Sequence, residues 1–463
     1  MWSWIFDRAL SFLRRNDIQE RQLELLREKF RALSRTEIGR RLGVKPYSRI
    51  EDLPITDYDF YKPFFENPSP SAFLYPLEEY VRVRTSGSTG EPKWFLTPKP
   101  AMEYSWRKAG MAMVLLFTHD GDRIRFTPGD TFYINAAPAP FSAGASHSMG
   151  SRMMKLVVNI VPDPDMPFHE KVRYFLENHD RIDVAAMPVS TLLTEIAPRV
   201  QKPLNLKGFI TQDSRLAYHY RDQIHEITGC HPSTIYISTE SLSPSLPSVQ
   251  HPTCFLFDWR VAYVEFRPLR VKGSEYEAGD PIPMWEVRAG ELYQPVFTHF
   301  KTEVTRYAMP DVLECVSRGD DVIGTELPVF RFVSRMDSLV SLHNFTRISE
   351  EELITALKNA GIEYVEFMTQ VAAVEGREHL TVYVEPAGEP MDEDEASKRL
   401  HEELLKIDPD YRTLHECFNY NPIRIRFLKP RTFQRFFEKL GGMPRVKRVN
   451  PTEKAIETLL SVM

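Results

Sequence analysis

The residues of this chain that are best suited to chemistry form one continuous run of small, polar and basic side chains. The run reads Thr85-Ser86-Gly87-Ser88-Thr89-Gly90-Glu91-Pro92-Lys93. Glycine permits tight turns whose amides can face anionic oxygens, the hydroxyl groups can donate hydrogen bonds, and Lys93 adds a positive charge. The sequence therefore predicts a phosphate-binding loop. It is not a Walker loop, because Pro92 stands where that motif needs glycine, and it lacks the Gly-x-Gly-x-x-Gly of dinucleotide binders.

Four segments, taken in chain order, resemble the motifs of the adenylate-forming superfamily, whose members activate carboxylates with ATP. The run from Thr85 to Lys93 resembles the phosphate-binding loop of that superfamily. Tyr236-Ile237-Ser238-Thr239-Glu240 resembles its Tyr-Gly-x-Thr-Glu element, and the segment from Thr305 to Val312 resembles its Tyr-Arg-Thr-Gly-Asp element. Phe332 to Asp337 resembles the Gly-Arg-x-Asp hinge that precedes a mobile C-terminal domain.

The resemblance implies a role for each matching residue. The phosphates of ATP would be held by the loop residues Thr85, Ser86, Gly87, Ser88, Thr89, Gly90 and Lys93. Ser238 and Thr239 would contact the nucleotide, and Glu240 would hold Mg²⁺. Asp311 would accept hydrogen bonds from both ribose hydroxyls.

Finer similarity indicates one branch of the superfamily. Five segments are similar to the plant auxin-responsive acyl acid amido synthetases and their microbial relatives. They are Arg21-Gln22-Leu23, Thr36 to Arg40, Pro54 to Tyr58, Tyr263 to Leu269 and Pro328 to Val333. The phenylacetate-coenzyme A ligase branch is the nearest competitor, and both branches share the first half-reaction.

The implied activity is that of an ATP-dependent carboxylic acid ligase. A carboxylate attacks the α-phosphate, pyrophosphate leaves, and coenzyme A or an amine then takes the acyl group from the adenylate. Because the first step brings two anions together, the site needs hydrogen-bond donors, a cation and Mg²⁺. Two alternatives remain open: a nucleotide or acid sensor without turnover, and a phosphotransferase that would release ADP instead of AMP.

The chain departs from the superfamily pattern at three places. Ile237 replaces the glycine of its element, and Thr211-Gln212-Asp213 stands where Gly-Gly-Glu is frequent. Met309 and Pro310 replace the residues that usually precede Asp311. These changes leave room for a diverged chemistry, and Pro310 is where we expect a distinctive backbone geometry.

Three further residues are candidates for catalysis. The resemblance implies a C-terminal lysine that contacts the substrate carboxylate, for which Lys447 is the candidate and Arg445 the alternative. Arg335 belongs to the hinge element. His147 could orient the carboxylate or act as a base, although a lone histidine among small residues is more often a hydrogen-bonded structural group.

The elements that must position these residues follow an α/β pattern. Short apolar runs at 183–187, 208–211 and 233–237 alternate with helical segments, which predicts a parallel or mixed sheet covered by helices. After residue 255 closely spaced strands predict an antiparallel sheet or a small barrel, and beyond Arg335 a second β/α pattern follows. We expect an ATP- and acid-binding domain over 1–333, a hinge at 334–337 and a small α+β domain over 338–463.

Composition limits the partners and the compartment. The 58 basic and 64 acidic residues give a formal net charge of 58 − 64 = −6, which supplies no field for nucleic acid. The four cysteines form no CxxC pair and no span is apolar enough for a membrane, so we expect a cytoplasmic protein with small-molecule partners. Trp2, Phe6, Leu10 and Leu13 share one helical face, which we expect to pack on its own domain, or else to form a homodimer.

Overall fold

The computed structural model describes residues 2–84, 93–136, 138–240, 242, 245–272, 275–337, 339–343, 346–439 and 447–463. The chain divides into two compact units. Unit 1 comprises Met1–Thr85, Trp94–Pro268 and Asp280–Val333. Unit 2 comprises Ser86–Lys93, Leu269–Gly279 and Ser334–Met463. That residues 334–337 act as a hinge stays a prediction.

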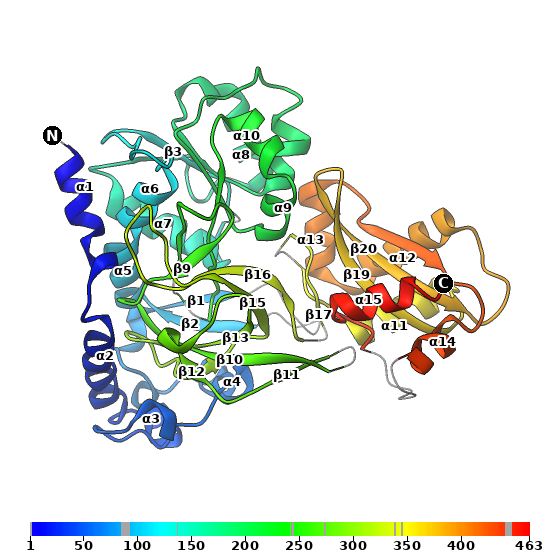
Figure 1. Cartoon of the computed structure of the whole chain (residues 1–463), viewed down its shortest axis with the longest axis horizontal. Helices are drawn as coiled ribbons and strands as arrows, with labels where there is room; N and C mark the ends of the chain where they lie inside the picture. Colours follow the sequence, from blue (N-terminus) through cyan, green and yellow to red (C-terminus); the bar gives the residue numbers. More distant parts are fainter. Residues whose placement is uncertain are drawn as a thin grey trace. The chain divides into compact units, whose positions relative to one another are not determined.

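Unit 1 begins with a helical segment (Figure 1), and burial shows that its apolar stripe faces its own core. The segment contains α1 (Trp2–Leu10), η1 (Ser11–Arg14) and α2 (Ile18–Leu33). Phe6, Leu10 and Leu13 are buried, whereas Trp4 is 67% exposed. The favoured expectation, core packing, is therefore confirmed for these three side chains. No helix in the described ranges is long and apolar enough to cross a membrane.

A parallel sheet forms one layer of unit 1 and confirms the predicted α/β pattern. Its strands run in the order β4 (Asn159–Val161), β3 (Thr131–Ile134), β5 (Val184–Ala186), β6 (Gly208–Thr211) and β7 (Pro232–Thr234). The helices between them include α7 (Ser142–Met154), α8 (Phe168–Asn178) and α10 (Arg221–Thr228). Parallel strands need such crossover helices, and side chains after their carboxyl ends meet at one edge of the sheet.

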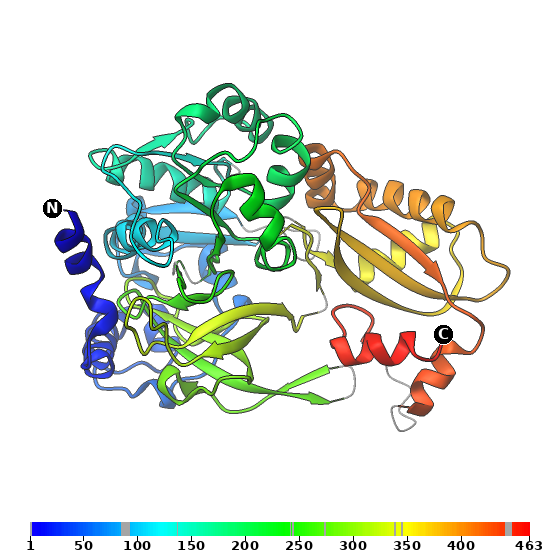
Figure 2. The ribbon, with the colours of Figure 1, turned by 45° about the horizontal axis from the view of Figure 1, so that its top comes forward.

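The second layer of unit 1 is the predicted antiparallel sheet (Figures 1 and 2). It orders β10 (Ala262–Lys272), β13 (Leu292–His299), β15 (Asp311–Ser317), β16 (Val329–Arg335), β9 (Phe255–Phe257) and β8 (Ser245–Pro247). Alternate residues turn aromatic rings inward, and Phe266 stacks on Phe330 with ring centroids 4.5 Å apart. This aromatic core supports the strands that carry Asp311.

Unit 2 is a small α+β structure, as the sequence pattern predicts. Its sheet pairs β19 (Tyr364–Val374) and β20 (Arg377–Pro386) as antiparallel strands, and β20 and β21 (Ile423–Phe427) as parallel strands. The sequence pattern predicts helices over 349–359 and 394–405, and they appear as α11 (Glu350–Asn359) and α12 (Glu393–Ile407). Three further helices were not predicted: α13 (Pro409–Phe418), α14 (Thr432–Lys439) and α15 (Glu453–Leu460).

The start of α13 carries a signal in the sequence that explains this helix. The Asp408 side chain accepts hydrogen bonds from the backbone amides of Asp410 and Tyr411, at 2.8 and 3.2 Å. Pro409 then occupies the first turn, where its missing amide hydrogen has no consequence. An aspartate followed by proline is thus a helix start that period counting alone overlooks.

Unit 2 buries His343, His379 and His401, and tyrosine hydroxyls hydrogen-bond to two of these rings. His343 Nε2 lies 2.6 Å from Tyr420 Oη, and His401 Nδ1 lies 2.6 Å from Tyr411 Oη. Burial lowers the pKa of His343, His379 and His401 from 6.5 to about 4. All three rings are therefore neutral at pH 7.

We expect unit 2 to lose stability as the pH falls from 6.5 toward 4. In that window the histidines take up protons in the unfolded chain but not in the folded unit. The free energy of unfolding therefore falls by on the order of 2 kcal/mol per histidine between pH 7 and 5. Hydrogen exchange of the β20 amides, corrected for intrinsic rates, measures the effect. Because three histidines share the pH-dependent loss of stability, His401→Gln should remove about a third of that loss. His415 is a half-buried neighbour, and His415→Gln serves as the control. Equal protection at both pH values would contradict the expectation.

Candidate functional site

Two predicted motifs that are 75 residues apart in the sequence meet inside unit 1. The Tyr236 hydroxyl, just after β7, donates a hydrogen bond of 2.5 Å to Oδ2 of Asp311, the first residue of β15. Asp311 is 4% exposed, and the Tyr236 ring stacks on Phe297 at 5.8 Å. The carboxylate is thus held at one oxygen by a buried phenol, in a position set by the parallel and the antiparallel sheets together.

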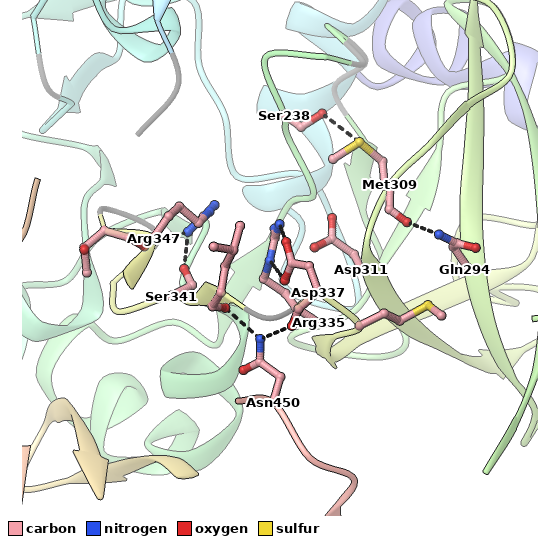
Figure 3. Close-up of polar contacts among 12 residues, drawn as sticks. Ser238, Gln294, Met309, Asp311, Arg335, Asp337, Ser341, Arg347 and Asn450 are labelled. Atoms are coloured by element: carbon pink, nitrogen blue, oxygen red, sulfur yellow. Dashed lines mark hydrogen bonds and ion pairs between the residues drawn. The ribbon is translucent and has the colours of Figure 1, made fainter. Parts of the chain in front are cut away.

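The residues beside this pair form a second link between the same motifs (Figure 3). The Ser238 hydroxyl lies 4.0 Å from the sulfur of Met309, and the Gln294 amide donates to the Met309 carbonyl at 2.7 Å. Gln294 belongs to β13, which lies next to β15 in the sheet. Met309, a departure from the superfamily pattern, therefore has a structural role here, since it joins Ser238 to the antiparallel sheet.

The unusual backbone of this segment lies at Arg306 and not at Pro310. Arg306 has φ 48°, in the left-handed region that a residue with a side chain seldom adopts. Its guanidinium binds both carboxylate oxygens of Glu265 in β10, at 2.9 and 3.0 Å. It also donates to the Leu53 carbonyl at 2.5 Å. Because both side chains of the ion pair are 6% exposed, the pair is a buried anchor for the chain that leads to Asp311.

The turn before Arg306 is fixed by two more buried charged groups. The ammonium of Lys29 in α2 donates to the carbonyls of His299, Thr302 and Val304, each at 2.7 Å. Glu303 accepts from the Tyr80 hydroxyl at 2.5 Å. Since Tyr80 begins β1 (Tyr80–Arg84), this contact ties the base of the predicted phosphate loop to the turn that leads to Asp311.

The two ends of the predicted phosphate loop lie side by side. β1 pairs with β2 (Trp94–Pro98) as an antiparallel hairpin, with Arg84 opposite Trp94. Lys93 is half-buried. The other predicted phosphate ligands lie outside the described residues. They are Thr85, Ser86, Gly87, Ser88, Thr89 and Gly90.

Thr239 and Glu240 follow Ser238 in a turn, and both are half-buried. Ile237, which replaces the glycine of the superfamily motif, is 38% exposed. Across the described ranges, no group of three or more His, Cys, Asp or Glu side chains could hold a metal ion. Glu240 is therefore a single carboxylate, and an Mg²⁺ ion bound there would need further oxygen ligands from phosphates and water.

Arg335 and Lys447 lie in unit 2, and Figure 3 shows Arg335 beside Asp337. Arg335 forms a two-bond ion pair with Asp337. The Lys447 ammonium donates to the Met336 carbonyl, and the Asn450 amide donates to the carbonyls of Asp337 and Leu339 at 2.9 and 2.7 Å. Lys447 thus binds the predicted hinge in this conformation. Arg445, the alternative to Lys447, lies outside the described residues.

His147 lies in α7, within unit 1, and both of its ring nitrogens lack a partner in the described part of the chain. The ring is 2% exposed, and burial, together with the charge of Lys171, lowers its pKa to about 4. The hydrogen bonds expected of a structural histidine are therefore not found among the described residues. A buried polar atom without a partner costs about 1–3 kcal/mol, so His147 and Asn135, whose amide is also unpaired, call for an explanation.

Sequence reasoning identified some of this site and passed over other residues. Tyr236 stood in a recognised motif, but only the structure shows that its hydroxyl binds Asp311. Asn135 and Lys171 carried no motif. The signal for Asn135 is its position directly after Thr131 to Ile134, an apolar run that forms β3.

Two domains of one family match the chain. Residues 255–335 match the GH3 family central domain, and residues 350–445 match the GH3 family C-terminal domain. A jasmonoyl-L-amino acid synthetase of Oryza sativa subsp. japonica is 25% identical over 268 residues, which cover 52% of this chain and 44% of the relative. A jasmonoyl-L-amino acid synthetase of Nicotiana attenuata is 28% identical over 194 residues, covering 40% and 32%. The chain spans less than half the length of either relative.

Solved structures share the fold. An acyl acid amido synthetase in complex with 2,4-DB has a TM-score of 0.54 at 16% identity, covering 98% of this chain and 95% of that chain. A 2-hydroxyisobutyryl-CoA ligase in complex with 2-HIB-AMP and CoA has a TM-score of 0.61 at 16% identity, covering 89% and 86%. At these identities the likeness concerns the fold. Residues 255–335 and 350–445 thus match two domains of the GH3 family, and the chain shares the fold of these two solved structures.

Proposed function

We propose that this protein is an ATP-dependent carboxylic acid ligase that works through an acyl-adenylate. A carboxylate oxygen of the acid bonds to the α-phosphorus of ATP as the bond to pyrophosphate breaks. An amine nitrogen then bonds to the acyl carbon, AMP leaves, and the amine loses a proton. No nucleophile from the enzyme is required, because binding and orientation carry the reaction.

The observation that carries the proposal is the contact between Tyr236 and Asp311. Two motifs that were assigned separately to the nucleotide meet at one buried hydrogen bond of 2.5 Å. Asp311 has a second oxygen that can accept from ribose, and Ser238 lies beside Met309 in the same region. The GH3 domain matches support the same reading independently.

The other nucleotide contacts are assigned by position. Residues 85–90 and Lys93 would bind the β- and γ-phosphates, since the hairpin of β1 and β2 presents this segment between two adjacent strand ends. Glu240 would hold Mg²⁺ together with phosphate oxygens, as is usual where a protein supplies one carboxylate. The ion would neutralise charge on the leaving pyrophosphate. Thr239 would contact the nucleotide next to it.

The acceptor that we propose is the amine of an amino acid. The named relatives are jasmonoyl-L-amino acid synthetases, and the amido synthetase structure matches nearly the whole chain. The thiol of coenzyme A is the competing acceptor, because a CoA ligase shares the fold.

Exchange of labelled pyrophosphate into ATP, measured over a panel of carboxylic acids, tests the first half-reaction. We expect exchange that depends on one class of acid and on Mg²⁺, with AMP as the nucleotide product when an acceptor is added. Mass spectrometry of mixtures with amino acids or coenzyme A then identifies the acceptor. Release of ADP, or the absence of exchange with every acid, would overturn the proposal.

We also propose that residues 334–337 are the hinge between domains 1–333 and 338–463, and that Lys447 reaches the acid carboxylate during adenylation. In the present conformation Lys447 binds Met336 and Asn450 binds Asp337. Both tethers hold the segment to residues 447–450 within unit 2. Lys447 can therefore act on substrate only after its bond to Met336 is released.

Asp337→Pro should slow amide formation by about tenfold while leaving pyrophosphate exchange within about threefold of wild type, because proline fixes φ where a hinge must change it. Asp337→Ala is the matched control. It removes the ion pair to Arg335 but keeps a free backbone, so both rates should stay near wild type. Steady-state amide synthesis and exchange are compared in the three proteins. Unchanged rates in Asp337→Pro would argue against a hinge at this position.

A further inference from the structure

At one edge of the parallel sheet, several buried polar atoms have no hydrogen-bond partner among the residues that the structure describes. Asn135 follows β3, is 5% exposed, and has neither Oδ1 nor Nδ2 hydrogen-bonded to the described chain. Ser190 and Thr191 follow β5 and are fully buried, and their hydroxyls are unpaired as well. β3 and β5 are adjacent strands, and the backbone N–H of Asn135 donates a hydrogen bond to the Ala186 carbonyl at 2.8 Å.

His147 belongs to the same β3 to α7 unit and is likewise unsatisfied at both ring nitrogens. Lys171 connects the two residues. Its ammonium donates to the carbonyl of Ala136, the neighbour of Asn135, at 2.8 Å, and its charge is close enough to lower the pKa of His147. A second bond to the Pro164 carbonyl, at 3.0 Å, keeps this ammonium engaged with backbone oxygens.

The position of these groups indicates a ligand. Open α/β sheets bind ligands beyond the carboxyl ends of their strands, where Asn135, Ser190 and Thr191 all lie. Native proteins rarely leave buried amide and imidazole groups unpaired. A group that binds there would restore the missing hydrogen bonds, because an asparagine amide and a neutral imidazole each offer one donor side and one acceptor side.

We propose that the acid used by this enzyme carries, besides its reactive carboxylate, an uncharged oxygen group such as a hydroxyl or oxo group, which Asn135 and His147 bind. This inference rests on the proposed ligase function. We expect an uncharged group because the Lys171 ammonium, the cation whose charge lowers the pKa of His147, already binds two backbone carbonyls. A cationic group would be repelled by Lys171.

Pairs of acids that differ by one oxygen test the proposal. We suggest 3-(4-hydroxyphenyl)propanoate with 3-phenylpropanoate, and a hydroxylated with an unsubstituted straight-chain acid of equal length. In wild type, kcat/KM for pyrophosphate exchange should be at least about tenfold higher for the oxygenated acid of a pair than for its partner without the oxygen. The partner would leave buried polar groups of the site without a hydrogen bond. Calorimetric binding of the same acids to the free protein gives a readout that does not depend on turnover.

Asn135→Leu and His147→Leu should reduce that preference to about one, because each removes the polar partner while keeping a side chain of similar bulk. Thr234→Val is the control. Thr234 is another buried residue with an unpaired hydroxyl, but it lies in β7, and its variant should keep the wild-type preference. Asn135→Leu should also unfold at a temperature no lower than wild type, since it removes a buried amide that has no partner in the free protein.

The outcomes separate the two proposals. Exchange that is equal for both members of every acid pair would overturn this inference and leave the ligase function in place. Exchange with no acid would overturn the ligase function, and calorimetry would still decide whether oxygenated acids bind more tightly. A large drop in unfolding temperature for Asn135→Leu, with the preference intact, would show that Asn135 is a structural group.

Discussion

Replacing Asp311 with asparagine is expected to lower kcat/KM for ATP in pyrophosphate exchange by about a hundredfold. The carboxylate has two acceptor oxygens, of which the Tyr236 hydroxyl occupies Oδ2. Asparagine has one acceptor oxygen and no charge, so the variant cannot accept from the buried phenol at one oxygen and from the ribose at the other. The rest of the side chain is unchanged in size, and the aromatic packing around Tyr236 should therefore persist.

A change of nucleotide makes this prediction specific. If Asp311 binds the ribose hydroxyls, wild type should prefer ATP to 2′-deoxy-ATP, and Asp311→Asn should lose most of that preference. Tyr236→Phe is the matched variant, because it keeps the ring on Phe297 and frees Oδ2 of Asp311. It should reduce kcat/KM by no more than about tenfold and keep the preference. An equal loss for both nucleotides in Asp311→Asn would contradict the ribose contact.

The sequence predicted the parts of this fold that depend on local pattern. The alternation of apolar runs and helical segments gave the parallel sheet, and the close spacing of strands after residue 255 gave the antiparallel sheet. Helices α11 and α12 follow from side-chain periodicity alone. Residues such as Ser238 and Asp311 could be named because each stands inside a motif of its own.

What could not be predicted depends on contacts between distant residues. The Tyr236 to Asp311 bond, the three carbonyls around Lys29 and the unpaired amide of Asn135 involve partners that no period or spacing brings together. Pro310 illustrates the limit. Its side chain drew attention in the sequence, but the left-handed backbone lies at Arg306, where the pairing with Glu265 holds it in place. Local strain is tolerated where distant contacts determine the conformation.

Arg306→Met should destabilise unit 1 by about 3–5 kcal/mol, which is the usual effect of removing one partner of a buried ion pair. The variant leaves the Glu265 carboxylate 6% exposed without its cation and removes the donor to the Leu53 carbonyl. Backbone strain is the same in both proteins, because methionine and arginine both carry a Cβ at φ 48°. All six tryptophans lie in unit 1, so urea unfolding followed by their fluorescence reports on this unit.

A double variant tells whether the Arg306–Glu265 pair only stabilises unit 1 or also positions Asp311. Arg306→Met with Glu265→Leu removes both charges, and replacing a whole buried pair with apolar groups is often nearly neutral. Stability should recover only in part, because the Leu53 carbonyl remains without its donor. If the pair also positions Asp311, the double variant should still show a raised KM for ATP at a temperature where it is fully folded. Recovery of stability together with a wild-type KM would mean that Arg306 acts on the fold alone.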